Sequence, residues 1–328
     1  MQEFLGPQTK LAELHVHLGS SVDPAVMWEI AHAQGIRLPT KDYWKFVDMV
    51  TVDPKRDKTF DEYLALFKWT ELIQSSPLAI ERSVYQTIAG AYRKNNITLL
   101  ELRFNPMKRN RGGEQDLDHI MMAAVRGIDR ASLEYPVRTG IIVCLDRTFN
   151  EKMNRILLEK AILFSSRGVV GIDVAGPARK GFRYSDYSGL FQKARREGLG
   201  LTVHAGEDEG HWSVEEVLEH LMPERIGHGV RATEDPRTME KLEKSGTVLE
   251  VCPTSNLNTG VVEDVSELRK RVRALMEAGV KLTINTDGPE MLRTNLRGEM
   301  EFLVREKVLS VAEVLEANRT AFEASFVS

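Results

Sequence analysis

Residues 11–18 read LAELHVHL, an apolar run that carries His15 and His17 near its C-terminal end. Apolar side chains at successive positions indicate a strand buried on both faces, which is typical of parallel sheets. Side chains two residues apart on a strand point to the same face, so the two imidazoles are expected to lie side by side. Such a pair suits a metal ion, although two incidental buried histidines would give the same short pattern.

Seven further runs of this kind follow along the chain and alternate with amphipathic stretches, such as 116–134, 188–198 and 266–279. The runs are ITLLELRF (97–104), VRTGIIVCLD (137–146), VVGIDVAG (169–176), LGLTVHAGE (199–207), ERIGHGV (224–230), GTVLEVCP (246–253) and VKLTINTD (280–287). Eight strands alternating with helices predict an α/β fold, a closed (β/α)8 TIM barrel. A doubly wound open sheet is the alternative, but no Gly-rich phosphate-binding turn follows a strand.

One spacing is irregular, because no strand is expected between Gly19 and about Ser76. This segment is predicted to be a helical insertion after the first strand, within a single domain of residues 1–328. An insertion at this end of a barrel lies over the active-site mouth, so its aromatic residues either pack together or form the wall of a pocket for a flat ring. These residues are Trp28, Trp44, Phe60, Phe67 and Trp69.

The composition is that of an ordinary soluble globular protein, with 42% hydrophobic and 28% charged residues among 328. No apolar run approaches the ~18 residues needed to span a membrane. A net charge of −4 gives no electrostatic basis for binding nucleic acid. The two cysteines, Cys144 and Cys252, lie in apolar runs and are expected to be buried free thiols, which favours a cytoplasmic location.

Several polar residues lie at the C-terminal ends of the predicted strands. His204 ends the fifth run, His228 lies in the sixth, Asp287 ends the eighth, and Glu207 follows His204 by three residues. In a barrel these ends meet at one mouth, together with those of the first strand. Three imidazoles and a carboxylate around an open position are typical of a hydrolytic site for a divalent metal ion, which lowers the pKa of water towards ~7.

The other histidines lie in helix-like or loop segments and are expected at the surface. They are His32, His119, His211 and His220. His211 follows an acidic turn and is the one of these that could lie near the mouth.

Several motifs together resemble the adenosine deaminase family of metal-dependent amidohydrolases. They are ELHVHL (13–18), HAGE (204–207), RIGHGV (225–230), EVCPTSNLNTG (250–260) and TINTDGP (283–289), supported by FDEYLALF (60–67), LLELRFNP (99–106) and GIDVAG (171–176). The resemblance covers nearly the whole chain. It implies a TIM barrel and a zinc-dependent deaminase. The separate group of deaminases with H-x-E and P-C-x-x-C motifs is not indicated, since neither motif occurs.

The resemblance implies that one Zn²⁺ per chain is held by His15, His17, His204 and Asp287. It also implies that Glu207 protonates the ring nitrogen next to the attacked carbon. That role needs a neutral carboxyl, so its pKa should be raised by an apolar surrounding. The ligands favour zinc without selecting it, since iron, cobalt or manganese also suit such a set.

Further roles follow from the same resemblance. His228 would orient the attacking water and stabilise the developing charge, and Asp287 would also accept a proton from that water. His17, Gly176 and Gly288 would lie beside the substrate, with the backbone of Gly176 close to a purine ring nitrogen. The alternative for Gly176 is a simple turn after a strand.

The sequence departs from the adenosine-specific members of the family at two positions. Those members carry an acidic residue for the ribose 5′-hydroxyl where this chain has Gly19, and a second aspartate for the purine imidazole ring where it has Gly288. Neither position is a metal ligand, so the chemistry should survive. The two glycines are expected to leave space in the pocket and to weaken plain adenosine as a substrate, unless Ser20, Ser21 or Glu290 substitutes.

The function expected from the sequence is zinc-dependent hydrolytic deamination of an aminopurine nucleoside or related compound, with release of ammonia. One alternative is an aminodeoxyfutalosine deaminase of menaquinone synthesis, whose substrate has a bulky 5′ group. Another is a catalytically weak purine-binding relative, although a pure binder has no need of Glu207 and His228. The expected partner is a small purine compound, with no nucleic acid or membrane involved.

Overall fold

The computed structural model describes residues 5–53, 59–110, 114–178 and 181–327. All eight predicted strands form and pair in sequential, parallel order. They are β1 (Leu11–His17), β2 (Ile97–Phe104), β3 (Arg138–Asp146), β4 (Val169–Ala175), β5 (Gly200–Ala205), β6 (Arg225–His228), β7 (Val248–Val251) and β8 (Leu282–Ile284). This arrangement confirms the predicted barrel and excludes the doubly wound sheet, whose strand order is not sequential.

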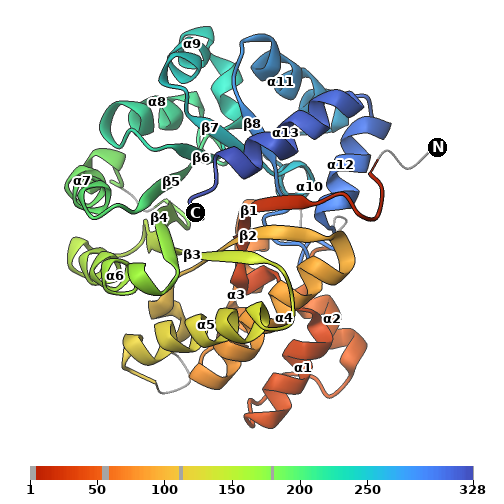
Figure 1. The fold of residues 1–328 in the computed structure, drawn as a ribbon, viewed down its shortest axis with the longest axis vertical. Coiled ribbons are helices and arrows are strands. Elements are labelled where there is room, and N and C mark those ends of the chain that lie inside the picture. Colours follow the sequence, from red (N-terminus) through yellow and green to blue (C-terminus); the bar gives the residue numbers. More distant parts are fainter. Residues whose placement is uncertain (1–4, 54–58, 111–113, 179–180, 328) are drawn as a thin grey trace.

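The last strand leads directly back to the first and closes the ring seen in Figure 1. Beyond β8, Asp287 forms a parallel bridge with Val16. The Asp287 amide donates to the His15 carbonyl at 2.9 Å, and the His17 amide donates to the Asp287 carbonyl at 2.8 Å. Closure of the barrel therefore places Asp287, which follows β8, beside His15 and His17 of β1.

Helices cover the outside of the strands (Figure 1). The helices are α1 (Pro24–Ala33), α2 (Tyr43–Val50), α3 (Phe60–Ile73), α4 (Pro77–Asn95), α5 (Leu117–Ser132), α6 (Glu151–Leu163), α7 (Ser188–Arg196), α8 (His211–His220), α9 (Pro236–Ser245), α10 (Pro253–Asn258), α11 (Val265–Glu277), α12 (Leu296–Arg305) and α13 (Val311–Glu323). Side-chain caps start many of them. For example, Asp23 precedes Pro24 and accepts from the Ala25 amide, which satisfies an amide that the first turn leaves free.

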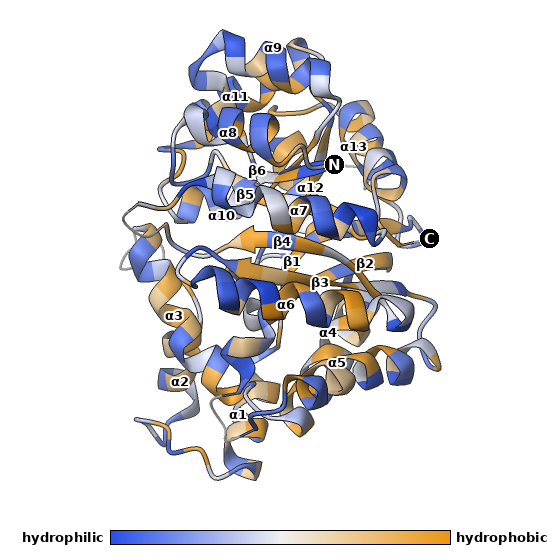
Figure 2. Cartoon of the chain, turned by 90° about the vertical axis from the view of Figure 1, so that its left-hand side faces the viewer, coloured by the Kyte–Doolittle hydropathy of each residue, from blue (hydrophilic) through white to orange (hydrophobic). Residues whose placement is uncertain are grey.

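The predicted insertion after β1 consists of α1, α2 and α3, although residues 54–58 of it lie outside the described residues. Thr59 and Glu62 form a capping box at the start of α3. In Figure 2 the arrow of β4 points towards the side on which α3 lies. Trp28 packs on Phe46, with ring centroids 5.1 Å apart, and Trp44 is 73% exposed, so these tryptophans have no place in a pocket wall.

The interior of the barrel contains buried charged side chains among the apolar ones. Six strand residues of this kind are at most 1% exposed: Glu13, Glu101, Arg103, Asp173, Arg225 and Glu250. They pair with one another or accept hydrogen bonds, as buried charges must. The barrel interior is thus less uniformly apolar than the sequence pattern of the strands suggests. Two of the buried carboxylates, Asp173 and Glu250, contact histidines at the C-terminal ends of the strands.

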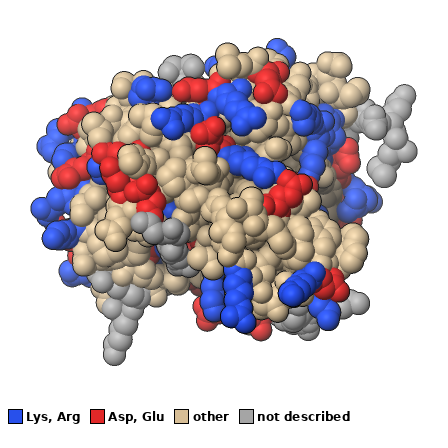
Figure 3. Space-filling model, turned by 90° about the horizontal axis from the view of Figure 1, so that it is seen from below, with Lys and Arg blue, Asp and Glu red and all other residues tan. Residues whose placement is uncertain are grey.

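The structure also describes the two cysteines, the lengths of the helices and the distribution of charge on one face. Cys144 and Cys252 are free and buried, as expected. Among the described helices, none combines the length and the apolar character that crossing a membrane requires. The face shown in Figure 3 carries basic and acidic side chains interspersed, rather than one continuous basic patch.

Candidate active site

The C-terminal ends of β1, β5 and β8 bring together the residues for which the sequence predicts a metal site. The Nε2 atoms of His17 and His204 lie 3.1 Å apart. Asp287 Oδ1 lies 3.5 Å from His17 Nε2 and 3.7 Å from His15 Nε2. All four side chains therefore point towards one small volume.

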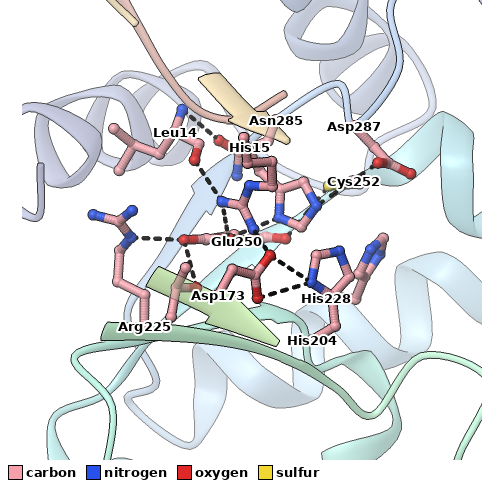
Figure 4. Close-up of polar contacts among 12 residues, drawn as sticks. Leu14, His15, Asp173, His204, Arg225, His228, Glu250, Cys252, Asn285 and Asp287 are labelled. Carbon is pink, nitrogen blue, oxygen red and sulfur yellow. Dashed lines mark hydrogen bonds and ion pairs between the residues drawn. The ribbon is translucent and has the colours of Figure 1, made fainter. Parts of the chain in front are cut away.

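Two buried carboxylates, one on β7 and one on β4, contact the Nδ1 atoms of His15 and His204. Glu250 Oε2 is 2.7 Å from His15 Nδ1, and Asp173 Oδ2 is 2.9 Å from His204 Nδ1. A carboxylate there accepts a hydrogen bond from Nδ1–H, so each ring presents the lone pair of Nε2 to the shared volume. Figure 4 shows Glu250 and Asp173 behind the two rings.

Arg103 links the two carboxylates from the barrel interior. Its Nη1 donates to Asp173 Oδ2 at 3.0 Å and its Nη2 donates to Glu250 Oε2 at 2.8 Å. Burial alone would raise the pKa of Glu250, but the guanidinium groups of Arg103 and Arg225 outweigh it and lower that pKa to about 2. Both carboxylates stay ionised at neutral pH, since the pKa of Asp173 is also held low, against its burial, by His204 and Arg103.

This set of donors fits a divalent metal ion. Burial lowers the pKa of His15 and of His17, so both rings are neutral, as metal binding requires. His15 Nε2 is buried and has no hydrogen-bond partner among the described residues. Burial raises the pKa of Asp287, and a nearby cation would stabilise its ionised form.

The orientation of Asp287 agrees with this reading. Ser255 Oγ and Tyr63 OH both donate to Asp287 Oδ2, at 2.7 and 3.2 Å. The other oxygen, Oδ1, is the one that faces the histidines. Hydrogen bonds to one oxygen thus fix the direction of the other.

Glu207 and His228 lie next to each other at the same mouth. Glu207 Oε1 is 3.3 Å from His228 Nε2, and both side chains are buried. Burial, with Asp287 and Asp208 nearby, raises the pKa of Glu207 well above its ordinary value. Glu207 is therefore a carboxyl that can carry a proton at neutral pH, as its expected role demands.

A side-chain amide sets the tautomer of His228. Asn256 Nδ2 donates to His228 Nδ1 at 2.9 Å. Because Nδ1 accepts, the proton of the neutral ring sits on Nε2, and burial keeps the ring neutral by lowering its pKa. The protonated Nε2 of His228 thus faces Glu207 and the shared volume, and it forms no hydrogen bond with another described residue.

Two of these residues have a backbone conformation that side chains other than glycine rarely adopt. The φ angle is 61° at His228 and 64° at Asp287. This conformation costs on the order of 1 kcal/mol or more per residue and persists where the surrounding fold imposes it. Both strained residues lie at the mouth where the histidines and Asp287 meet. Backbone strain of this kind is commonly found at functional sites.

A cavity of about 350 Å³ opens beside these residues, a size suited to a small molecule. The helix α3 lines one wall with residues at helical spacing: Phe60, Tyr63, Leu64, Phe67, Lys68 and Glu71. His17, His204, Glu207, His228 and Asp287 lie at its inner end. The insertion therefore contributes an aromatic wall through Phe60 and Phe67, as one of the two readings of its aromatic residues anticipated.

Gly176 lies on another wall of the cavity and has φ = 88°. A Cβ at this position would be 3.0 Å from Asp146 Oδ2. Gly176 therefore makes a turn after β4 and also lines the cavity, and its backbone contact with a purine ring stays a prediction.

The expectation that Gly19 and Gly288 leave space is wrong. A Cβ on Gly19 would lie 2.9 Å from Phe67 Cδ1 and 3.0 Å from Arg109 Nη2. A Cβ on Gly288 would lie 2.6 Å from Ser20 Oγ and 2.7 Å from Ser20 Cβ. Neighbouring side chains have filled both positions, so neither glycine marks a void.

Replacing Gly288 by alanine is expected to destabilise the protein by about 1–3 kcal/mol, since the added methyl group meets the Cβ of Ser20. Denaturant unfolding measures this change. Gly90→Ala is the matched control, because a Cβ at that position in α4 meets nothing within 4 Å and should be neutral or slightly stabilising. Equal stability of the two variants would contradict the packing described here.

Cationic side chains line the cavity near Gly19. Arg109 is only 2% exposed, and its Nη1 lies 3.9 Å from Glu71 Oε1. Lys108 Nζ lies 2.6 Å from Asp146 Oδ2. The cavity beside Gly19 therefore carries a guanidinium group, whose Nη2 is 3.0 Å from where a Cβ on Gly19 would lie.

Several residues of the site have no role that the sequence predicted. These are Tyr63, Arg103, Arg109, Asp173, Glu250 and Asn256. A charged residue within an otherwise apolar strand, as at Arg103, Asp173 and Glu250, was the sequence feature that could have indicated such a role. Two of the histidines that were predicted at the surface, His32 and His119, are exposed. His211 is half-buried at the start of α8 and contacts Thr238 rather than the cavity.

Comparison with known sequences agrees with the motifs. The sequence model of the family described as adenosine deaminase matches residues 10–328. The adenosine deaminase of Shewanella loihica is 30% identical over 318 residues, which span 97% of this chain and 94% of the relative.

Solved structures share the barrel. The adenine deaminase of Arthrobacter aurescens superposes with a TM-score of 0.86 at 23% identity, over 97% of this chain and 94% of that one. An amidohydrolase from Burkholderia ambifaria, solved with bound Zn, gives a TM-score of 0.85 at 18% identity, over 99% and 87% of the two chains. Because the sequence match extends from β1 to the end of the described chain, this protein belongs to the adenosine deaminase family and is a hydrolytic deaminase.

Proposed function

We propose that this chain hydrolyses the amino group of a 6-aminopurine compound with the help of one zinc ion, releasing ammonia. The observation that carries the proposal is the convergence of His15, His17, His204 and Asp287 beside the Glu207–His228 pair. In the reaction, water adds to the carbon that bears the amino group, and the carbon–nitrogen bond then breaks. The products are a 6-oxopurine and ammonia.

His15, His17, His204 and Asp287 would hold the metal ion. When bound, a divalent metal ion acts as a Lewis acid that makes water a good nucleophile near neutral pH. The zinc in the Burkholderia ambifaria structure supports the choice of metal. The buried carboxylates behind His15 and His204 keep the correct tautomers for binding.

The chain's own acids and bases would move the protons. Glu207, kept protonated by burial, donates its proton to the ring nitrogen next to the attacked carbon, which removes the aromatic character that resists addition. His228 donates its Nε2 proton in a hydrogen bond to the added oxygen and stabilises the charge that develops there. Asp287 accepts a proton from the attacking water.

His17 and Gly176 would contact the purine, since both line the cavity. Gly288 is a weaker candidate than expected, because its side-chain direction is occupied by Ser20. The α3 wall, with Phe60 and Phe67, offers apolar surface for a flat ring.

The substrate is proposed to carry an anionic group at the end remote from the amino group. Arg109 Nη2 lies 3.0 Å from where a Cβ on Gly19 would be, and Lys68 and Lys108 line the same cavity. A guanidinium group binds phosphate or carboxylate through charge-assisted hydrogen bonds. Arabidopsis proteins with this fold, 22% identical, were crystallised with IMP and with GMP, which supports a nucleotide-like substrate. Aminodeoxyfutalosine, with its bulky 5′ group, is the second candidate.

The test is a panel of purines assayed by ammonia release. AMP or aminodeoxyfutalosine should exceed adenosine in kcat/KM, and Arg109→Met should reduce that advantage by about tenfold or more, the scale of a lost hydrogen bond between charged groups. Arg155→Met, in an exposed pair on α6, is the matched control and should leave the ratio unchanged. Preference of the wild type for adenosine over every anionic compound would contradict the role of Arg109.

A further inference from the structure

The opposite end of the barrel is closed by residues 324–327, which we name the floor segment. It follows α13, and Figure 1 places this end of the chain in the middle of the ring of strands. Glycines at the beginnings of β4 and β5 make room for it. A Cβ on Gly200 would lie 2.2 Å from Phe326 Cγ, and one on Gly171 would lie 2.9 Å from Phe326 Cδ2. The Phe326 ring therefore occupies a socket that only glycine permits.

Polar contacts fix the floor segment to the barrel interior. Ser325 Oγ and the Phe326 amide donate to Glu101 Oε1 at 2.7 and 2.6 Å. Arg225 Nη1 donates to the Ala324 carbonyl at 2.7 Å. The Arg225 guanidinium carbon lies 3.6 Å from the centre of the Phe326 ring, a stacked arrangement.

Arg225 continues these contacts towards the site. Its Nε donates to Glu250 Oε1 at 2.6 Å, and the second oxygen of Glu250 lies 2.7 Å from His15 Nδ1. Figure 4 shows Glu250 between Arg225 and His15. Each of these three side chains is fully buried. An unbroken series of contacts thus joins Phe326 at the floor to His15 at the mouth.

The geometry points to Phe326 as a positioning residue for His15. The ring covers the guanidinium of Arg225, excludes water from it and limits its orientation. Arg225 in turn fixes Glu250, which selects the ring orientation and tautomer of His15. Residues that hold a metal ligand without contacting the metal strengthen metal binding, because they orient that ligand. The inference rests on the proposed role of His15 as a metal ligand.

The test uses the full chain and zinc alone, without substrate. Phe326→Ala should weaken zinc binding by about three- to tenfold in a chelator competition, less than the 10–100-fold typical of a direct partner of a ligand. Phe302→Ala is the matched control, since Phe302 is also half-buried beside an arginine, with Arg305 5.5 Å from its ring, but lies on α12. The control should leave zinc affinity unchanged.

Two further variants separate positioning from general stability. Gly200→Ala should expel the Phe326 ring and weaken zinc binding by a similar factor, and the double variant with Phe326→Ala should be no weaker than either single one. If Phe326→Ala does not fold, Phe326→Leu fills the socket without an aromatic face and should lower zinc affinity in the same direction. In the zinc-free protein, nitrogen NMR of the histidines should show one His15 tautomer in the wild type and a mixture in the variant.

The inference is overturned if Phe326→Ala and Phe326→Leu bind zinc as tightly as the wild type, or if the effects of Gly200→Ala and Phe326→Ala add. A wild-type protein that binds no zinc would instead overturn the proposed metal site. The two failures are therefore distinguishable by the zinc titration of the wild type.

Discussion

Glu207→Gln is expected to lower kcat by at least about 100-fold while the fold and the zinc content stay unchanged. The amide has nearly the same shape as the carboxyl, but it cannot deliver the proton that the purine ring nitrogen needs. Glu207 is well suited to that delivery, because burial raises its pKa and His228 Nε2 lies 3.3 Å from its Oε1. The measurement is ammonia release at saturating substrate, paired with elemental analysis of the same sample.

Glu215→Gln is the matched control for this variant. Glu215 lies on α8 and accepts a hydrogen bond from Thr238 outside the cavity, so its replacement should leave kcat close to that of the wild type. Loss of zinc in parallel with activity in Glu207→Gln would mean that Glu207 is a ligand and that its assigned role is wrong.

Removal of a metal ligand is expected to have the other large effect. Purified protein should contain about one equivalent of zinc, and His15→Ala or Asp287→Ala should lose it together with at least about 100- to 1,000-fold of the activity. This scale corresponds to the several kcal/mol that a metal ion contributes to charge stabilisation. Each variant removes one of four donors whose positions the barrel closure has fixed.

The thermal midpoint provides an independent readout of the same site. Zinc binds only the folded state, so adding zinc to the metal-free wild type should raise the midpoint, and the ligand variants should not respond. His211→Ala, which removes a half-buried histidine beside Thr238, should behave like the wild type. Activity that persists after exhaustive chelation of the wild type would refute the metal site.

Much of the architecture follows from local patterns. Each of the eight apolar runs contains a strand, with boundaries within a few residues of the run, because burial on both faces of a parallel sheet demands a continuous apolar stretch. The barrel rule then places His15, His204 and Asp287 at one end, since parallel strands share the direction of their C-termini. For these residues, position along a strand was enough to predict that they meet.

What tertiary structure alone decided depends on contacts between residues far apart in the chain. The sequence could not show that Glu250 supports His15 or that Asn256 sets the tautomer of His228, because these pairs depend on which inward-facing side chains meet across the barrel. Gly19 is the clearest case. Its lack of a side chain suggested an empty space, yet Phe67 from the insertion and Arg109 from the helical turn after β2 fill that space. A sequence records which side chain is missing, whereas packing determines which distant side chain takes its volume.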